Sequence, residues 1–381
     1  MAYFDNASTT YPKPDEVYSF MDSFYRTYGG SAGRGDYDLA NNAKGIIDET
    51  RALVQNLLHC PAKQVVFTST ATIALNMIIQ GLIVGGAKNF YISPFEHNAV
   101  TRVLHHFEQS GQITVSELIV SKLLDYDLER IRYQFDSLRP DVVVVSHASN
   151  VIGLVAPVEQ IFELAKEYSA NTLVDMAQTA GLVDLNVGLE TIDYAVFAGH
   201  KTLFGPTGIS GFVMKPNANI SPVLFGGTGY DSANQNMPDS IPEKYEMGTL
   251  NIAGIAGLNA ALKWIKNKTV ENLFKEEEEQ RQRLLRILGD YHFLTVVGNV
   301  EGRKYVGIVS CLLDGISSDS AGSLLSERGI SVRTGLQCAP KAHLFLGTYP
   351  AGTIRFSVNM FTSDEDYKEL RDALEDIALE M

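Results

Sequence analysis

Short apolar runs alternate with amphipathic segments from about residue 65 to about residue 215. The runs are rich in β-branched residues, which is typical of buried parallel strands, and the segments between them have helical spacing. The clearest predicted strands cover residues 65–67, 90–92, 142–145, 172–174 and 194–197. This alternation predicts an α/β domain built around a mostly parallel central sheet.

A different pattern follows a polar loop at residues 228–247. From Ile252 to about Asp290 the apolar positions recur at helical spacing, and this stretch contains four consecutive glutamates at 276–279. Charge runs on helices are usually solvated, so we expect these glutamates to face water without a function.

Beyond this helical stretch, short strands are predicted near 306–311 and 353–358, and a terminal helix near 364–379. They predict a second, smaller α/β unit. We therefore expect a large domain over residues 16–255 and a small C-terminal domain over 256–381, joined by the N-terminal segment 1–15.

The composition of the chain excludes some classes of function. The chain has 381 residues, 45% of them hydrophobic, which favours two domains over one core. The net charge of −14 argues against a nucleic-acid partner, because phosphate backbones require clustered Lys and Arg. Three separated cysteines cannot all form disulfides, and we see no signal peptide and no membrane-spanning run. We expect a soluble cytoplasmic protein that acts on a small molecule and holds no metal.

Polar residues follow two of the predicted strands, at the edge where open α/β sheets bind ligands. Asp175, with Gln178 three positions later, follows the strand at 172–174, and a buried carboxylate there needs a partner such as a protonated pyridine nitrogen. Lys201 follows Gly199 and His200 after the strand at 194–197. A desolvated lysine there would have a lowered pKa and could form an imine with an aldehyde.

The hydroxyl-rich stretch at 68–72 lies between a strand and a predicted helix over about 72–83. Free N–H groups and small hydroxyls at a helix N-terminus suit a phosphate, although ordinary N-capping by Ser or Thr would give the same sequence. A glycine-rich nucleotide motif is absent, which disfavours a dehydrogenase.

Seven segments in order resemble the motifs of cysteine desulfurases, which belong to the class V aminotransferase superfamily with the type I fold of pyridoxal-phosphate (PLP) enzymes. The segments are YFDNASTT at 3–10, EHN at 96–98, SNVIG at 149–153, VDMAQ at 174–178, GHK at 199–201, EMGTLN at 246–251 and RTGLQCA at 333–339. The resemblance spans nearly the whole chain.

The resemblance implies how PLP would be held. Lys201 would bind it as a Schiff base, Asp175 would pair with the pyridine nitrogen, Gln178 would bond the phenolic oxygen, and His97 would stack on the ring. The remaining implied contacts are Ala71, Thr72 and His200 to the phosphate, Thr249 to the phosphate from the second subunit of a homodimer, and Asn150 and Arg355 to the substrate carboxylate.

The same resemblance implies removal of sulfur from L-cysteine, giving L-alanine and a persulfide on Cys338, in sulfur metabolism such as iron–sulfur cluster assembly. A sulfur-acceptor protein is a further implied partner. Cys338 lies in a loop-like stretch, where Arg355 could favour its thiolate and His97 could act as the proton donor and acceptor. Cys311 ends an apolar run and Cys60 follows a helix, so both are expected to be structural.

This chain departs from the family pattern at three places. Ala198 and Ala71 remove hydroxyls that bond the phosphate in many members, and Leu336-Gln337 replaces the paired histidines found before the cysteine in several relatives. How Cys338 is deprotonated therefore stays open. The alternatives are a selenocysteine lyase, a β-lyase or an aminotransferase on the same fold, and a non-catalytic PLP-fold binding protein.

Overall fold

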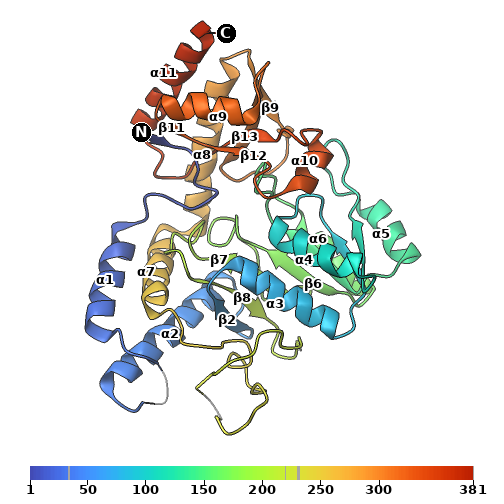
Figure 1. Ribbon diagram of the computed structural model, residues 1–381, viewed down its shortest axis with the longest axis vertical. Helices are drawn as coiled ribbons and strands as arrows, with labels where there is room; N and C mark the ends of the chain where they lie inside the picture. Colours follow the sequence, from blue (N-terminus) through green and yellow to red (C-terminus); the bar gives the residue numbers. More distant parts are fainter. Residues whose placement is uncertain (33–34, 219, 230–231, 381) are drawn as a thin grey trace.

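The computed structural model describes residues 1–32, 35–218, 220–229 and 232–380. Figure 1 shows two units, a large one built on a seven-stranded sheet and a smaller one above it that carries the C-terminal third of the chain. Among the described residues, no helix combines the length and the apolar character needed to cross a bilayer.

The large sheet has the strand order β2-β8-β7-β6-β5-β3-β4. All five strands predicted from the sequence are present, and the prediction of a mostly parallel sheet is confirmed, since only β8 runs antiparallel to its neighbours. Two strands, β4 and β8, were not predicted. The strands are β2 (Gln64–Thr68), β3 (Asn89–Ile92), β4 (Thr114–Glu117), β5 (Val142–Ser146), β6 (Asn171–Asp175), β7 (Tyr194–Ala198) and β8 (Ser210–Met214).

Helices cover both faces of this sheet, which explains why its central strands are buried at nearly every position. Along β5, Val142 and Val144 pack into one core with α3 and α4, whereas Val143 and Val145 pack into the other core with α2, α5, α6 and α7. The covering helices are α2 (Asp38–Leu57), α3 (Ala71–Val84), α4 (Asn98–Gln109), α5 (Leu128–Ser137), α6 (Val158–Glu167) and α7 (Ile252–Lys268), with α1 (Asp15–Tyr28) packed on α7.

The small unit has a four-stranded sheet in the order β12-β13-β10-β9. The predicted strands and terminal helix are confirmed as β10, β13 and α11. The elements are α8 (Val270–Gly289), β9 (Leu294–Val297), β10 (Ile308–Leu313), α9 (Ser318–Glu327), β11 (Ile330–Ser331), β12 (Arg333–Gly335), α10 (Pro340–Leu346), β13 (Thr353–Ser357) and α11 (Asp364–Glu380).

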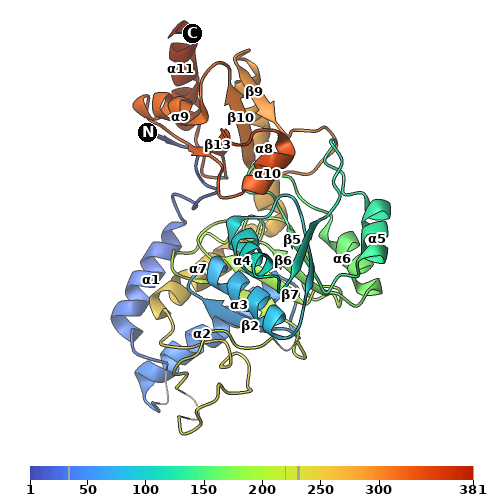
Figure 2. The ribbon, with the colours of Figure 1, turned by 45° about the vertical axis from the view of Figure 1, so that its right-hand side comes forward.

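The N-terminal segment belongs to both units. Strand β1 (Ala2–Tyr3) pairs in parallel with β11, and Asp5 forms a bridge with Ser357 of β13. The chain then reaches the large unit, where Thr10 donates its backbone N–H to His200 and its hydroxyl to the carbonyl oxygen of Lys201. Figures 1 and 2 both show the N-terminus beside the small unit, and Figure 1 shows it close to β11.

The helical stretch predicted from 252 to 290 is two helices, broken at Thr269, whose φ is 68°. The expected domain boundary at 255 and 256 falls inside α7, and α7 packs on α1 and α2 of the large unit. We propose Thr269 as the division between the two units.

The prediction that the run at 276–279 faces water without a role is wrong for Glu277. Its neighbours Glu276, Glu278 and Glu279 are exposed, but Glu277 is 7% exposed. Its carboxylate accepts a hydrogen bond from the N–H of Gly307 at 2.6 Å, and burial raises its pKa to about 8. One position in the acidic run therefore anchors the loop that leads into β10.

Candidate active site

A cavity of about 260 Å³ lies at the carboxyl ends of the central strands. It is lined by eight of the residues singled out from the sequence, from five separate segments of the chain. They are Ala71, Thr72, His97, Asn150, Asp175, Gln178, His200 and Lys201. Parallel strands end at one edge, so residues that follow β5, β6 and β7 meet there although they are far apart in sequence.

Asp175 and Lys201 form the charged pair of this cavity. Burial lowers the pKa of Lys201 to about 8, with the nearby Asp175 carboxylate opposing the shift. Burial also raises the pKa of Asp175, opposed by its hydrogen bond from the N–H of Ala177. The second carboxylate oxygen of Asp175 accepts no hydrogen bond from the described residues, so it is open to a cationic ligand.

His97 is held in one orientation because it caps helix α4. Its Nδ1 accepts a hydrogen bond from the N–H of Ala99 at 3.0 Å. Burial, followed by the charges of Lys201, Arg102 and Arg355, lowers the pKa of His97 to about 4. The ring is therefore neutral near pH 7, with its hydrogen on Nε2, because Nδ1 acts as the acceptor.

The start of α3 forms the other wall of the cavity. Thr70 is the N-cap, and its hydroxyl accepts from the N–H of Ile73, so the N-capping interpretation is confirmed for this residue. Ala71 and Thr72 line the cavity in the first turn, where helical N–H groups have no partner within the helix. Nδ1 of His200 is buried without a hydrogen-bond partner among the described residues. These donors leave an anion site at this wall.

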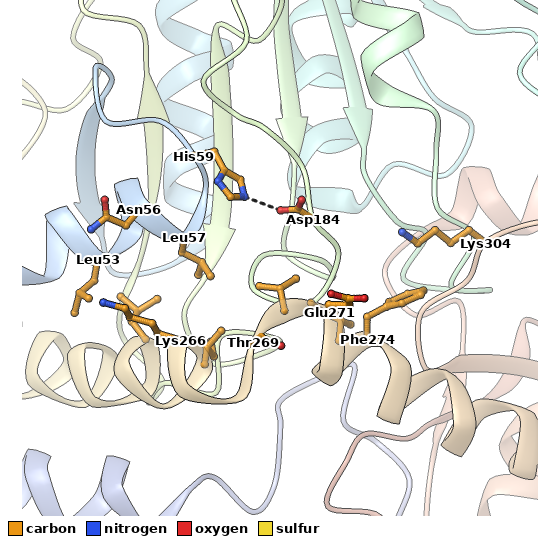
Figure 3. Close-up of a pocket in the computed structure, with 14 residues that line it drawn as sticks. Leu53, Asn56, Leu57, His59, Asp184, Lys266, Thr269, Glu271, Phe274 and Lys304 are labelled. Carbon is orange, nitrogen blue, oxygen red and sulfur yellow. Dashed lines mark hydrogen bonds and ion pairs between the residues drawn. The ribbon is translucent and has the colours of Figure 1, made fainter.

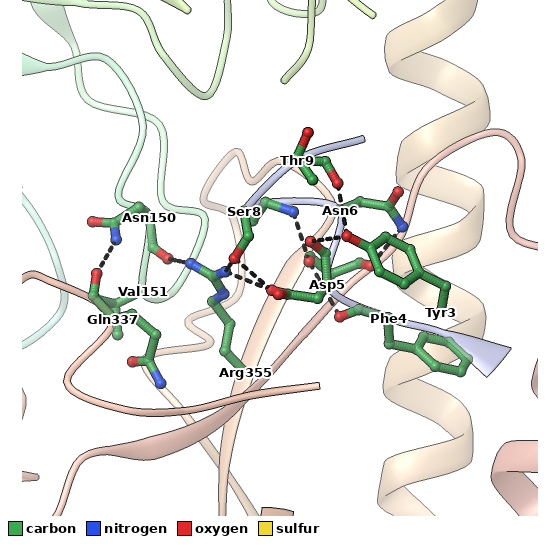
Figure 4. Close-up of polar contacts among 12 residues, drawn as sticks. Tyr3, Phe4, Asp5, Asn6, Ser8, Thr9, Asn150, Val151, Gln337 and Arg355 are labelled. Carbon is green, nitrogen blue, oxygen red and sulfur yellow. Dashed lines mark hydrogen bonds and ion pairs between the residues drawn. The ribbon is translucent and has the colours of Figure 1, made fainter. Parts of the chain in front are cut away.

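Arg355, in β13, is 3% exposed and lies beside this cavity rather than in its lining. Figure 4 shows its guanidinium between the carbonyl oxygen of Asn150, 2.8 Å away, and the side chains of Asp5 and Ser8, each 2.9 Å away. Its Nε is buried and has no partner among the described residues. One guanidinium N–H is therefore left without a hydrogen-bond acceptor in this conformation.

Cys338 stands on a strained turn next to the cavity. Gln337 and Cys338 both have left-handed backbones, with φ values of 39° and 57°. Two contacts hold the turn to the large unit: Asn150 Nδ2 donates to the carbonyl oxygen of Gln337 at 2.6 Å, and the N–H of Asn98 donates to that of Cys338 at 2.7 Å. The thiol side chain is exposed, on a turn fixed beside His97 and Asn150.

The side chain of Gln337 points away from the cavity, into the small unit. It is buried, donates to the carbonyl oxygen of Thr353 at 2.9 Å, and pairs with Nε2 of His343 at 2.9 Å. Gln337 therefore supplies no base to Cys338. Its role in the fold is to tie the turn to β13 and α10.

The other two cysteines are buried, as expected. Burial raises the pKa of Cys60 to about 11 and that of Cys311 to about 12, so both are neutral thiols near pH 7. Thr249 is exposed and does not line the cavity of the single chain.

Two contributors were not singled out from the sequence. Glu96, next to His97, is fully buried and accepts hydrogen bonds from the Ser93 hydroxyl and from the N–H and hydroxyl of Ser146. Burial raises its pKa to about 7. Asp5, the second contributor, holds Arg355. Both lie inside the quoted motifs, but only their contacts show that they brace the site.

A separate hollow of about 580 Å³ lies where α2 ends and α7 meets α8 (Figure 3). Its lining is mostly apolar, and its polar pair, His59 and Asp184, is exposed and joined at 2.8 Å. Its lysines, Lys266 and Lys304, are exposed too. Because it shares no residue with the cavity at the strand ends, we assign the chemistry to the smaller cavity.

Comparisons with known proteins show the family and the fold of the chain. The class-V aminotransferase model matches residues 2–370. A probable cysteine desulfurase of Methanothermobacter thermautotrophicus is 29% identical over 99% of this chain and 94% of its own length. The apo structure of cysteine desulfurase from Thermococcus onnurineus NA1 superposes with a TM-score of 0.90 at 26% identity, covering 100% of this chain and 95% of its own. The structure of the cysteine desulfurase CsdA from Escherichia coli, in its S-sulfonic acid form, superposes with a TM-score of 0.84 at 25% identity. This match covers 99% of this chain and 94% of the CsdA chain. The chain belongs to the class-V aminotransferase family.

Proposed function

We propose that this protein is a PLP-dependent cysteine desulfurase that converts L-cysteine to L-alanine and collects the sulfur on Cys338. The observation that carries the proposal is the pairing of a half-buried lysine, Lys201, and a buried carboxylate, Asp175, in one cavity with an exposed thiol on the adjoining turn. The names of the most similar relatives support the substrate and the reaction.

The cavity fits PLP by its donor set. Lys201 would hold the aldehyde carbon, the open oxygen of Asp175 would pair with the ring nitrogen, and Gln178 would reach the phenolic oxygen. The first turn of α3, at Ala71 and Thr72, would hold the phosphate together with the unpartnered Nδ1 of His200. When bound, PLP supplies an electron sink for bonds to the substrate's α-carbon.

The protein's own residues would orient the substrate and move its protons. The free Nε–H of Arg355 and the amide of Asn150 would bind the carboxylate, while Asp5 and Ser8 keep the guanidinium in place. His97 is neutral, so its Nε2–H is a proton donor within the cavity. Lys201, with its pKa lowered to about 8, exchanges protons readily near neutral pH.

The sulfur step then balances without an added oxidant. The thiolate of Cys338 attacks the substrate sulfur, the bond between that sulfur and the substrate's β-carbon breaks, and the β-carbon takes a proton to give alanine. The new S–S bond leaves a persulfide on Cys338. A thiol or an acceptor protein removes the outer sulfur and restores the enzyme.

We further propose a homodimer in which Thr249 reaches the partner's phosphate site. Exposed aromatic side chains on and near α1 support a second copy covering this face, since large exposed apolar patches usually mark interfaces. They are Tyr11, Tyr18, Tyr25, Tyr28 and Tyr37. Three free cysteines support a reducing, cytoplasmic location.

The test is to incubate the purified, PLP-loaded protein with L-cysteine and excess dithiothreitol, and to measure alanine and sulfide together. Equal amounts of both are expected. Pyruvate and ammonia in place of alanine would instead make the protein a β-lyase. A rate with L-selenocysteine far above that with L-cysteine would make it a selenocysteine lyase.

A further inference from the structure

Glu96 is a fully buried acid behind the cavity that we assign to PLP. It lies between β3 and α4, one residue before His97, and its exposed fraction is 0%. The donors that reach its carboxylate in the described structure are all uncharged. Burial of a carboxylate without a cation costs free energy, so an acid kept buried beside a reaction site points to a function.

Three hydrogen bonds hold the Glu96 carboxylate. Its Oε1 accepts from the backbone N–H of Ser146 at 2.6 Å and from the hydroxyl of Ser93 at 2.7 Å. Its Oε2 accepts from the hydroxyl of Ser146 at 2.8 Å. The Ser93 hydroxyl also accepts from the N–H of Phe95 at 3.2 Å, so its own hydrogen is directed at Glu96. A carboxylate surrounded by donors is stabilised in its ionised form.

Ser146 connects Glu96 to the cavity. It is the last residue of β5 and pairs in register with Asp175, the last residue of β6, and both line the cavity. A serine hydroxyl has one hydrogen, and Ser146 donates it to Glu96. The hydroxyl therefore offers only a lone pair to the cavity. Beside it lies the Asp175 oxygen that accepts no hydrogen bond from the described residues.

Titratable groups face Glu96 from two other segments. Asp175 repels it from the end of β6, and Tyr126, just before α5, is a buried phenol that burial keeps neutral. Burial raises the pKa of Glu96 to about 7, with the Asp175 charge acting in the same direction and the three hydrogen bonds acting against both. A cation bound in front of Asp175 would favour the ionised forms of both acids, and they would favour the cation in return.

We propose that Glu96 is a positioning residue for PLP, which fixes the Ser146 hydroxyl so that the ends of β5 and β6 present only hydrogen-bond acceptors to the ring. The inference rests on the proposed function and extends the cofactor assignment beyond Asp175. A protonated pyridine nitrogen donates one hydrogen bond and finds acceptors at this wall, whereas an unprotonated nitrogen needs a donor that these two side chains do not offer. Glu96 acts through Ser146 and does not touch the cofactor.

The experiment compares two ligands of the full-length protein freed of cofactor. One is PLP, and the other is its carbocyclic analogue, in which a C–H group replaces the ring nitrogen. Both carry the same aldehyde and phosphate, so the ratio of their dissociation constants, measured by equilibrium dialysis at pH 7.5, isolates the contact at the ring nitrogen. The unmodified protein should prefer PLP.

Glu96→Gln should lower this preference by roughly tenfold, the effect of weakening one charge-assisted hydrogen bond. The backbone N–H of Ser146 can only donate, so the amide oxygen of the glutamine has to take the place of Oε1. Its NH₂ group then donates to the Ser146 hydroxyl, whose hydrogen turns toward the cavity and opposes a protonated ring.

The matched control is Glu277→Gln. Glu277 is also buried and also accepts a backbone N–H, but it does not line or adjoin the cavity, so the preference should not change. Ser146→Ala is the second variant, which keeps Glu96 and removes only the hydroxyl. It should lower the preference by about threefold, and it decides the question if circular dichroism shows that Glu96→Gln does not fold.

Equal losses of affinity for PLP and for the analogue would mean a merely structural role and would overturn the inference. So would an unchanged preference in either cavity-side variant that folds, or the same loss in Glu277→Gln. The measurement needs no turnover. If the preference behaves as expected but L-cysteine yields no alanine, the desulfurase proposal fails and this inference stands. If the unmodified protein binds no PLP, both fail.

Discussion

The two halves of the candidate site are built by opposite means. The cavity around Lys201 is formed where buried apolar strands end, and eight side chains from separate segments face one volume of about 260 Å³. Cys338 instead stands on a turn with two left-handed residues, exposed, and tied to the large unit by two hydrogen bonds. The first half is held by the core, and the second by a few local contacts.

This difference matches what each half has to do. A cofactor that controls bond breaking needs fixed partners, and packed strand ends provide them. A thiol that first meets a substrate and then an acceptor needs access from outside, and segments with few buried contacts open at low cost. Substitutions in the two halves should therefore fail in distinguishable ways.

The largest effect is expected from Lys201→Ala, in the rigid half. Loss of the covalent link to PLP should lower turnover by roughly 10⁴-fold or more, as for other groups that bond the reacting species. The absorbance of the protein and the borohydride-reducible attachment of PLP report the link directly. Lys304→Ala, at an exposed lysine, is the control. A reducible adduct on another lysine in the Lys201 variant would disprove the assignment.

Cys338→Ala should stop sulfur release without changing the cofactor cavity, and so distinguish the two halves of the site. The variant should retain PLP and its colour, because no cavity residue changes, while sulfide release falls by about 10²-fold or more. Mass spectrometry after a cysteine pulse without reductant should find one added sulfur on the Cys338 peptide of the unmodified enzyme. Cys60→Ala and Cys311→Ala should still release sulfide. Undiminished release from the Cys338 variant would refute its role.

Gln337→Ala tests whether the turn itself positions the thiol. Removing a buried hydrogen-bond partner of His343 and Thr353 should cost about 1–3 kcal/mol of local stability and slow sulfur transfer by about tenfold. Alkylation of Cys338 should accelerate because the turn opens more often. If Gln337 acted only on the reaction and did not hold the turn, the alkylation rate would not change. Leu336→Ala, on the same turn, serves for comparison. An unchanged alkylation rate would mean that the turn is fixed by other contacts.

The smallest effect concerns Glu277 of α8, outside both halves of the site. Its pKa is raised from 4.5 to about 8 by burial, so above pH 4.5 the unfolded chain holds fewer protons and stability falls as pH rises toward 8. Glu277→Gln removes this titration and should raise Tm relative to the unmodified protein by about 2–4 °C at pH 8, with less gain at pH 5. Glu278→Gln, exposed, should show no such trend. A gain that is equal at both pH values would show that Glu277 is not the titrating group.

The sequence predicted the rigid half far better than the exposed one. Strands such as β5 and β7 contain nearly continuous apolar runs, and polar residues just past such strands can be assigned to a common edge without knowing the structure. β8, with the sequence SGFVM, escaped prediction because its first two residues, Ser210 and Gly211, interrupt the apolar pattern.

Polar contacts between residues far apart in the sequence could not be predicted either. The pairing of Asp5 with Arg355 joins opposite ends of the chain, and the inward direction of Gln337 depends on His343 and Thr353. Glu277 looked like part of a solvated run because nothing local indicates that Gly307 would donate to it. Such contacts depend on tertiary packing, which periodicity does not report.

The shared N-terminal segment has a consequence for how the protein is made. Residues 64–214, which hold the large sheet, leave the ribosome well before Ile330 and Ser357, the partners of Ala2 and Asp5. Ala2 and Asp5 therefore wait for partners that are translated much later, and pairings between such distant positions form slowly. Because Thr9 and Thr10 also bond the backbone of His200 and Lys201, the lysine loop gains these anchors from the same segment whose other partners are translated late. A nascent chain should thus acquire its reactive centre late, after most of its fold exists.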